Sequence, residues 1–257
     1  MRIYVYRPEV RCLNKAMETL SDHKTGCLVC GDEVVYHNTF ESHECFYCKQ
    51  SYESNSTCAA GHYVCDSCHS LSATNFIQQF CNSSELTDPL QMALILMQHP
   101  AVKMHGPEHH FLVPAVLLAA YYNLKEDYAR KKEKIGEAEK RAKQILGGFC
   151  GFYGDCGAAV GTGIFLSLIT DATPLSVDSW RLSNMMTARA LMSIALHGGP
   201  RCCKRNTYLA IMEATRFLKE NFNVQMAVPS KIKCPFSPLN KECLKEECRF
   251  YPKDAKN

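Results

Sequence analysis

Residues 198–222 read GGPRCCKRNTYLAIMEATRFLKENF: a glycine-rich turn, two adjacent cysteines and then a long segment with the period of a helix. Similar segments follow one another from Asp88 onward, whereas the alternation typical of strands is almost confined to the first 70 residues. Spacings of three and four residues between apolar side chains predict helices, and alternation predicts strands. The sequence therefore predicts a mainly α protein, with a helical body and short β hairpins near the N-terminus.

The two adjacent thiols, Cys202 and Cys203, are not expected to form a disulfide with each other. Neighbouring Cα atoms lie ~3.8 Å apart, whereas an unstrained disulfide needs ~4.4–6.8 Å. Three interpretations remain: small buried side chains, a reactive thiol, or ligands of a metal or cluster.

Cysteine is the outlier of the composition, with 16 residues among 257. The N-terminus, MRIYVYRPEVRC, has neither the apolar core nor the cleavage site of a secretory signal. The longest apolar run, residues 111–122, is shorter than the ~20 residues that cross a bilayer. We therefore expect a cytoplasmic protein without membrane contact, whose thiols bind metal rather than form disulfides. So many thiols also favour a reducing, anaerobic cell.

A compact group of ligand pairs occupies the segment 27–70. Two tetrahedral zinc sites need eight soft or borderline ligands, and a CxxC pair places two sulfurs on one ion. Glycines beside the pairs suit the tight turns that this requires. The eight expected zinc ligands are Cys27, Cys30, Cys45, Cys48, Cys58, His62, Cys65 and Cys68.

The order of these pairs resembles the cross-braced zinc modules of the RING and treble-clef type. The resemblance implies that the first and third pairs share one ion and that the second and fourth share the other. A sequential pairing stays open, as does His69 as a substitute ligand. The segment carries six carboxylates and one lysine, a net charge of −5. Because phosphate contacts need Lys and Arg, this charge disfavours nucleic acid and favours a structural role or the docking of a protein partner.

We expect four parts: an N-terminal segment (1–26), the zinc module (27–70), a helical domain (71–225) and a cysteine-rich tail (226–257). Helices are expected over 89–98, from 107 onward with a bend or restart at Pro114, over 126–145, and from about 156, 176 and 203. The segment 126–145 interleaves charges of both signs, which predicts a solvated helix. Small residues at 157–163 would let another backbone or a cofactor approach closely.

Seven further cysteines are dispersed and form no CxxC pair. Three of them lie at predicted helix starts, where the positive end of the helix dipole lowers thiol pKa values and favours anionic groups. Burial as small side chains is the alternative for each. The seven expected cluster ligands are Cys150, Cys156, Cys202, Cys203, Cys234, Cys243 and Cys248.

Two of these segments resemble the iron–sulfur L-serine dehydratases and the related cysteine desulfidases. CGAAVGTG at 156–163 and CCKRN at 202–206 are similar to the two cysteine-containing helix starts of that family. The resemblance implies a [4Fe–4S] cluster with one open iron, with Cys156 and Cys203 as ligands. The family's third ligand position holds no cysteine here, so Cys202 or Cys150 would substitute, and Ala159 replaces the family's acidic residue.

The whole chain resembles a family of unknown function from anaerobic archaea and bacteria. The shared elements are CAAGHYVCDSCH at 58–69, GPEHHFLVPA at 106–115 and GGPRCCKRN at 198–206, and they imply an architecture without an activity. In the tail, Cys234 begins a Cys-Pro pair of the kind common around iron–sulfur ligands. The tail thiols are expected to hold a second cluster or to complete the first, and a flexible tail is the alternative.

A second chemical candidate is the helix start at 105–110. A helix N-terminus keeps histidine neutral and able to accept a proton, and a capping cluster on the surface is the alternative. Two arginines near the adjacent thiols would bind an anionic substrate group. The five predicted catalytic residues are Glu108, His109, His110, Arg201 and Arg205.

The leading functional expectation is a [4Fe–4S]-dependent, non-redox enzyme, namely a lyase of the elimination or desulfuration type or a sulfur-transfer enzyme, acting on a small, polar, anionic molecule. The alternative is a non-enzymatic cluster carrier, redox sensor or docking subunit. The expected cofactors are two structural zinc ions and one [4Fe–4S] cluster, with a second cluster as an option. A small-molecule substrate, a protein partner of the acidic zinc module and a second copy of the chain are the expected partners. No nucleotide-binding loop or nucleophile elbow is present in the sequence.

Overall fold

A computed structural model describes residues 27, 29–30, 32–65, 68, 72–229 and 231–252 of the protein. The chain divides into two compact units, 1–70 and 71–257, and each is described by itself. The predicted N-terminal segment 1–26 and His69 lie outside the described residues. Among the described helices, none combines the length and the apolar character that a membrane crossing requires.

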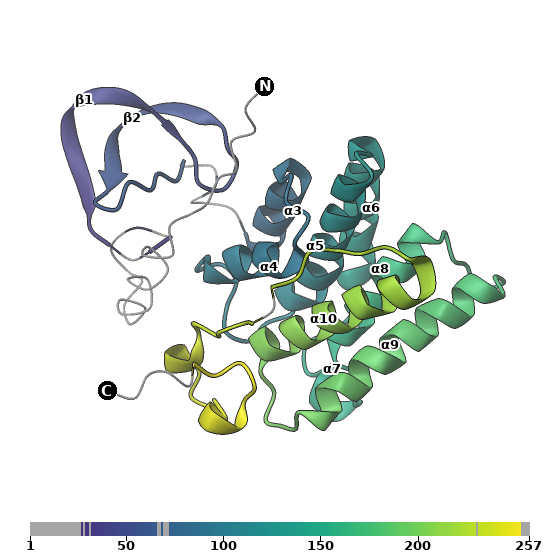
Figure 1. Ribbon diagram of the computed structural model, residues 1–257. Helices are drawn as coiled ribbons and strands as arrows, with labels where there is room; N and C mark the ends of the chain where they lie inside the picture. The colour runs from purple at the N-terminus through teal and green to yellow at the C-terminus, as the bar shows by residue number, and fades with distance from the viewer. Residues whose placement is uncertain are drawn as a thin grey trace. The chain divides into compact units, whose positions relative to one another are not determined.

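The N-terminal unit is built on one antiparallel hairpin, β1 (Val34–Glu44) and β2 (Ser51–Cys58), which form a two-stranded sheet (Figure 1). The register places Val34 opposite Cys58 and Glu44 opposite Ser51, with an irregularity in the middle of β1. A two-stranded sheet is at best marginally stable in water, and most described side chains of this hairpin are exposed. The hairpin therefore needs stabilisation from outside the sheet, and cysteine groups lie at both of its ends.

The described part of the helical unit contains eight α-helices and two short 3-10 helices. α5 is buried on almost all sides, because it contacts α3, α4, α6, α8 and α10 (Figure 1). The mainly α fold with a small N-terminal β element, predicted from the sequence, is confirmed. The elements are α3 (Ala73–Ser83), α4 (Pro89–Gln98), α5 (Glu108–Leu124), α6 (Tyr128–Ala142), α7 (Phe149–Phe152), α8 (Gly157–Ile169), α9 (Asp178–Leu196), α10 (Cys203–Phe222), η1 (Ser237–Leu239) and η2 (Lys245–Glu247).

The helix does not restart at Pro114, because α5 continues through this residue. A proline inside a helix leaves the carbonyl four residues earlier, here that of His110, without its usual partner. α8 lies against this point: a Cβ on Gly161 would come within 2.8 Å of Pro114 Cδ and 3.0 Å of the His110 oxygen. The small size of Gly161 therefore lets α8 pack closely against α5.

Gly161→Ala is expected to destabilise the protein by about 1–3 kcal/mol, because the new methyl group would overpack a rigid proline ring and a backbone carbonyl. Gly136 in α6 is the matched control, since a Cβ there would meet nothing within 4 Å. Gly136→Ala should stabilise the helix by roughly 0.5–1 kcal/mol. Chemical denaturation measures both changes in the free energy of unfolding. A Gly161→Ala protein as stable as the wild type would contradict the close packing of α5 and α8.

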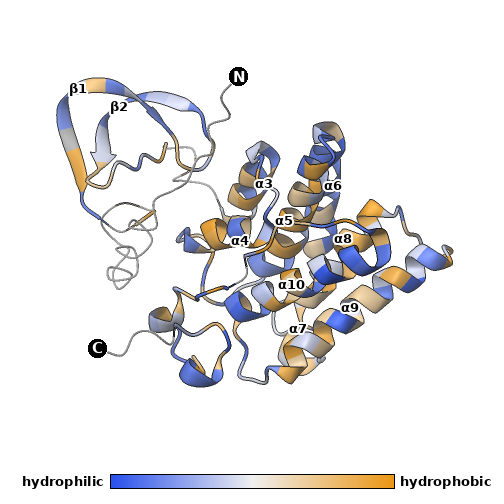
Figure 2. Ribbon diagram, viewed as in Figure 1, coloured by the Kyte–Doolittle hydropathy of each residue, from blue (hydrophilic) through white to orange (hydrophobic). Residues whose placement is uncertain are grey.

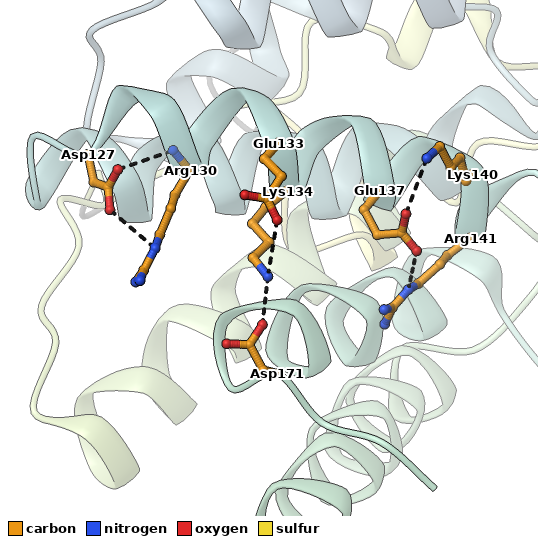
Figure 3. Close-up of polar contacts among 8 residues, drawn as sticks. All are labelled: Asp127, Arg130, Glu133, Lys134, Glu137, Lys140, Arg141 and Asp171. Carbon is orange, nitrogen blue, oxygen red and sulfur yellow. Dashed lines mark hydrogen bonds and ion pairs between the residues drawn. The ribbon is translucent and has the colours of Figure 1, made fainter.

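α6 is the solvated helix predicted from its charges. Ion pairs lie along it, such as Lys140 Nζ with Glu137 Oε2 at 3.6 Å, and exposed pairs of this kind contribute little each. Lys134 Nζ, in contrast, joins α6 to Asp171 Oδ1, just after α8, at 2.6 Å (Figure 3). Lys131 differs, because it is buried and its Nζ donates to Ser84 O at 2.9 Å and to Asn123 Oδ1 at 2.8 Å. One lysine of this charged helix is therefore buried in the core and hydrogen-bonded there.

Candidate metal-binding sites

One group of four ligand residues gathers where β1 begins and β2 ends. The ligand atoms of Cys27, Cys30, Cys58 and His62 all lie within 4.8 Å of one another. Cys30 Sγ is 3.3 Å from Cys58 Sγ, which in turn is 3.7 Å from His62 Nδ1. The antiparallel register brings the residues before β1 next to the end of β2, so this group joins the first ligand pair to the third.

A second group gathers at the turn end of the hairpin. Cys45 and Cys48 follow β1, Cys65 and Cys68 follow β2, and their four sulfurs lie within 4.8 Å of one another. All four side chains are buried, and Cys48 Sγ is 3.8 Å from Cys65 Sγ. The second ligand pair is thus joined to the fourth, the interleaved pairing that the resemblance to cross-braced zinc modules implies. A sequential pairing does not occur.

Close packing of the thiols shifts their pKa values in both groups. The hydrogen bond between Cys27 and Cys30 lowers the pKa of Cys27 to about 3 and raises the pKa of Cys30. In the second group, burial raises the pKa values of Cys48 and Cys68. A metal ion displaces such protons when it binds, and sulfurs with at most one imidazole are the donors of structural zinc. Both groups can therefore hold metal ions such as zinc.

A third group of thiols lines one pocket in the helical unit, which we call the four-thiol pocket. Cys202 is the N-cap residue of α10, and Cys234, Cys243 and Cys248 come from the tail after it. These sulfurs are more widely spaced: within the described chain, only the two N-terminal groups place three or more ligand atoms within 4.8 Å of one another. Burial raises the pKa of Cys202, and it raises the pKa of Cys234 to about 12.

The tail is packed onto α10, which contradicts the alternative of a flexible tail. Phe236 and Phe250 are both buried. The ring of Phe250 lies edge to face with that of Tyr208, at 5.3 Å between centroids, and the Phe236 ring lies 4.8 Å below Lys204 Nζ. The amide of Cys234 donates to the carbonyl of Phe250 at 2.7 Å, which closes the tail on itself. Apolar burial therefore holds the three tail thiols at the start of α10.

Backbone amides donate to cysteine sulfurs in the same way in both units. In the N-terminal unit, the amide two residues later donates to the sulfurs of Cys27 and Cys58, at 3.4 and 3.2 Å. In the tail, the amide two residues later donates to the sulfur of Cys243, at 3.4 Å, and to that of Cys234. The first turn of α10 donates to Cys202 Sγ, also at 3.4 Å. Because such bonds favour the thiolate, the tail cysteines share the local geometry of the N-terminal ligands.

Two cations and one hydroxyl are buried at this pocket. Lys204 lies beside it and Arg205 lines it, and both donate to backbone carbonyls. No carboxylate in the described chain forms an ion pair with either. Tyr208 also lines the pocket, is 1% exposed, and its hydroxyl has no hydrogen-bond partner among the described residues. The half-exposed carboxylate of Glu242 also lines the pocket. Buried hydroxyls need partners, so the pocket suits a group that accepts a hydrogen bond from Tyr208.

The ligand set implied by the iron–sulfur dehydratases is divided in the structure. Cys156, the N-cap residue of α8, accepts from Asn206 Nδ2 at 3.4 Å, and Cys203 is near it. Cys202 instead lines the four-thiol pocket, which neither Cys156 nor Cys203 lines, and Cys150 lies in α7. The three tail thiols therefore line a pocket together with Cys202. They do not share it with Cys156 and Cys203, the two residues on which the resemblance to the dehydratases rests.

His109 does not have the free nitrogen that a role in proton transfer requires. Its Nε2 donates to the carbonyl of Lys103 at 3.1 Å, and its Nδ1 accepts from Thr207 Oγ1 at 3.1 Å. The ring is 1% exposed, and burial lowers the pKa of His109 to about 3. The neutral imidazole thus joins α5 to α10 and to the loop before α5.

The other four predicted catalytic residues are not brought into one pocket. His110 Nδ1 donates to a backbone carbonyl at 3.1 Å, and burial lowers the pKa of this histidine. Glu108 accepts from a backbone amide at 2.8 Å, and Arg201 is exposed. Only Arg205 lines the four-thiol pocket.

Tyr208 is the functional candidate that the sequence analysis missed. It lies four residues after Lys204 and three after Arg205, and residues at these spacings share one side of a helix. The helical period of segment 203–222 could therefore have shown that Tyr208 lies on the same side of the helix as Lys204 and Arg205.

Comparison with known proteins places the helical unit in a family. No curated protein and no solved structure matches the chain. The profile of a family of unknown function, DUF5714, matches residues 77–251, more than half of the chain. The matched segment contains all seven dispersed cysteines and none of the eight N-terminal ligands. The chain belongs to the family of unknown function DUF5714, and the four-thiol pocket lies within the matched region.

Proposed function

We propose that the helical unit binds a [4Fe–4S] cluster in the four-thiol pocket and that the N-terminal unit binds two structural zinc ions. The observation that carries the proposal is that one helix-capping thiol and three tail thiols line the same pocket. Four cysteine thiolates are the usual ligands of such a cluster. The cluster ligands would be Cys202, Cys234, Cys243 and Cys248.

The spacing of the sulfurs supports a cluster over a single ion. Four sulfurs bound to one zinc ion at ~2.3 Å lie less than ~4 Å from one another. The two N-terminal groups are close to this spacing, whereas the four-thiol pocket is wider. A cluster separates its thiolates because iron and sulfide lie between them.

The surroundings of the pocket match the charge of this cluster. A [4Fe–4S] core in its 2+ state, bound by four thiolates, is a dianion. Arg205 supplies one buried positive charge, and the Tyr208 hydroxyl supplies a donor for a sulfur atom. Burial lowers the pKa of Lys204 to about 7, and an anionic cluster nearby would favour its protonated form. The cluster would thus add an anionic partner to Arg205, whose described partners are all uncharged, and an acceptor for the Tyr208 hydroxyl.

Ligation by four cysteines favours the non-enzymatic alternative, a redox sensor or cluster carrier, because no iron is left open to a substrate. Cys243 and Cys248 are only half-buried, which keeps one side of the site near solvent, as exchange of electrons or of a cluster requires. The lyase with an open iron and a small-molecule substrate stays a prediction, and the two occupied nitrogens of His109 weigh against it. Thiolate chemistry of this kind fits the reducing cytoplasm.

Metal analysis of the full chain, purified and reconstituted without oxygen, tests the proposal. We expect about four iron and four acid-labile sulfide per chain, a paramagnetic signal after one-electron reduction, and about two zinc. No iron after reconstitution, or iron without sulfide, would overturn the cluster. Zinc in place of iron in the helical unit would do the same.

For the N-terminal unit we propose the docking of a protein partner in addition to zinc binding. The observation that favours this role is Phe40, which is 68% exposed on β1 and is followed directly by Glu41. An exposed aromatic ring among carboxylates is typical of a protein-contact surface and unsuited to phosphate. An oligonucleotide titration should show no salt-dependent binding, and such binding would exclude the proposal.

Tyr208→Phe is expected to lower the reduction potential of the cluster while leaving its iron content unchanged. Loss of one hydrogen bond of about 1 kcal/mol corresponds to roughly 40 mV for a one-electron couple. A redox titration of the reconstituted variant measures the shift. Tyr121→Phe is the matched control, because Tyr121 lies in α5 and does not line the pocket. Equal reduction potentials in the wild type, Tyr208→Phe and Tyr121→Phe would show that the Tyr208 hydroxyl does not contact the cluster.

A further inference from the structure

Cys156 and Cys203 lie near each other, outside the four-thiol pocket. Cys156 is the N-cap residue of α8, Cys203 is the first residue of α10, and the two helices are in contact. Asn206, one turn after Cys203, donates through Nδ2 to Cys156 Sγ at 3.4 Å. Burial raises the pKa of Cys203 to about 11, and the charge of Cys156 adds to this shift. The two thiols therefore share one place, where two helices begin.

The start of a third helix, α5, reaches the same place. The amide of Gly106, just before α5, donates to the sulfur of Cys203. The ring of His110, in the first turn of α5, lies against Gly157 so closely that a Cβ on this glycine would overlap it. Gly157 directly follows Cys156. Three helix N-termini thus converge on the two thiols, and the positive ends of helices favour thiolates.

The sulfur of Cys156 is not used to cap its own helix. Cys202 occupies the N-cap position of α10, and its sulfur accepts from an amide of that helix. Cys156 occupies the same position in α8 without such a bond. Its donor comes from α10 instead, because Asn206 Oδ1 accepts from Arg205 Nε at 3.4 Å and Nδ2 faces the sulfur. Both Cys156 and Cys203 are free thiols and only half-buried, so a small reagent can reach them.

We propose that Cys156 and Cys203 form a redox-active dithiol that reduces the disulfide of a small, anionic thiol compound. The Cys156 thiolate attacks one sulfur of the substrate, breaks its S–S bond and expels one thiolate. Cys203 then attacks Cys156 Sγ, forms the Cys156–Cys203 disulfide and expels the second thiolate. The two protons of the dithiol pass to the two released thiols, and its two electrons reduce the substrate.

The charge beside the dithiol favours an anionic substrate. The start of α10 is hydrophilic (Figure 2), and Arg201, just before it, is exposed. The positive charge of Arg201 acts on Cys203, and no carboxylate of the described chain forms an ion pair with this arginine. A carboxylate of a small disulfide can therefore pair with Arg201 while its sulfur meets Cys156.

Titration of the full, metal-loaded chain with glutathione disulfide tests the dithiol, with free thiols alkylated afterwards and the peptides analysed by mass. We expect one reversible disulfide, between Cys156 and Cys203, and the loss of two free thiols per chain. Cys203→Ser should stop at a mixed disulfide of Cys156 with glutathione, and Cys156→Ser should form neither product. Cys150→Ser is the matched control, because this half-buried thiol lies in α7, and it should react as the wild type does.

Arg201→Gln tests the charge of the substrate. It should slow the reaction with glutathione disulfide about threefold and should not slow the reaction with cystamine, a cationic disulfide. An equal loss of rate with both reagents would contradict an anionic substrate.

Two results would overturn the dithiol: no Cys156–Cys203 disulfide in the wild type at any concentration of glutathione disulfide, or loss of iron in Cys203→Ser, which would make this thiol a cluster ligand. The dithiol does not rest on the proposed cluster, because neither thiol lines the four-thiol pocket. A protein that binds no iron but still forms this disulfide would support the dithiol and refute the cluster alone.

Discussion

Cys234→Ser is expected to abolish cluster binding, lowering the iron content from about four per chain to near zero on anaerobic reconstitution. Cys234 is one of the two more deeply buried thiols of the four-thiol pocket, and its amide closes the tail onto Phe250. Serine keeps the size and the amide contacts of the side chain but supplies an oxygen, which is a poor ligand for iron in a cluster. The helical content should not change, because the packing of Phe236 and Phe250 on α10 does not depend on the sulfur.

Two controls separate this assignment from the ligand set that the resemblance to iron–sulfur dehydratases implies. Cys150→Ser removes a half-buried thiol of α7 and should leave the iron content unchanged. Cys156→Ser removes a thiol that the resemblance names as a ligand but that does not line the pocket, and it should also retain iron. Loss of the cluster in Cys156→Ser, with iron retained in Cys234→Ser, would reverse the assignment.

Cys45→Ser is expected to remove one zinc ion and to unfold the turn end of the N-terminal hairpin. The sheet has two strands and mostly exposed side chains, so we expect most of its folding free energy to come from the proposed zinc ions. Structural zinc contributes an apparent ~10–16 kcal/mol in small domains. We expect the zinc content to fall from two to one per chain and proteolysis to become rapid between residues 41 and 52.

The helical unit provides the reference in the same sample, because it has its own core and should resist the protease. A chelator should have a larger effect than Cys45→Ser, since it removes both ions, and added zinc should restore resistance. An N-terminal unit that stays resistant without metal would show that the two cysteine groups do not stabilise it.

Local signals in the sequence predicted the elements and the N-terminal ligands. Each CxxC pair is a short-range feature, and the helical period of segments such as 89–98 is as well. The interleaved grouping depends instead on contacts between distant residues. The hairpin register brings Cys27 and Cys58 together, and the segment after β2 brings Cys65 to Cys45, with the amide of Phe46 donating to the carbonyl of Tyr63 at 2.8 Å. The resemblance to zinc modules implied that grouping, whereas the spacing of the pairs left it open.

Long-range packing decided what the sequence could not. Lys131 and Lys204 have the side chains of surface residues, yet both are buried, because backbone carbonyls from distant segments accept their protons. Long-range packing also decided the surroundings of the two adjacent thiols. Cys202 and Cys203 are neighbours in sequence, but the first turn of α10 directs Cys202 to the tail pocket and places Cys203 near Cys156.

The order in which the pocket's parts leave the ribosome follows from the packing of the tail on α10. Synthesis runs from the N-terminus, so a domain can begin to fold before its last residues are made. α10 is complete at Phe222, whereas Cys248 and Phe250 emerge more than 25 residues later. Until then, Tyr208 lacks the ring of Phe250 that covers it. A nascent chain interrupted before residue 234 would contain one of the four thiols, so the proposed cluster could be acquired only after the tail has been synthesised.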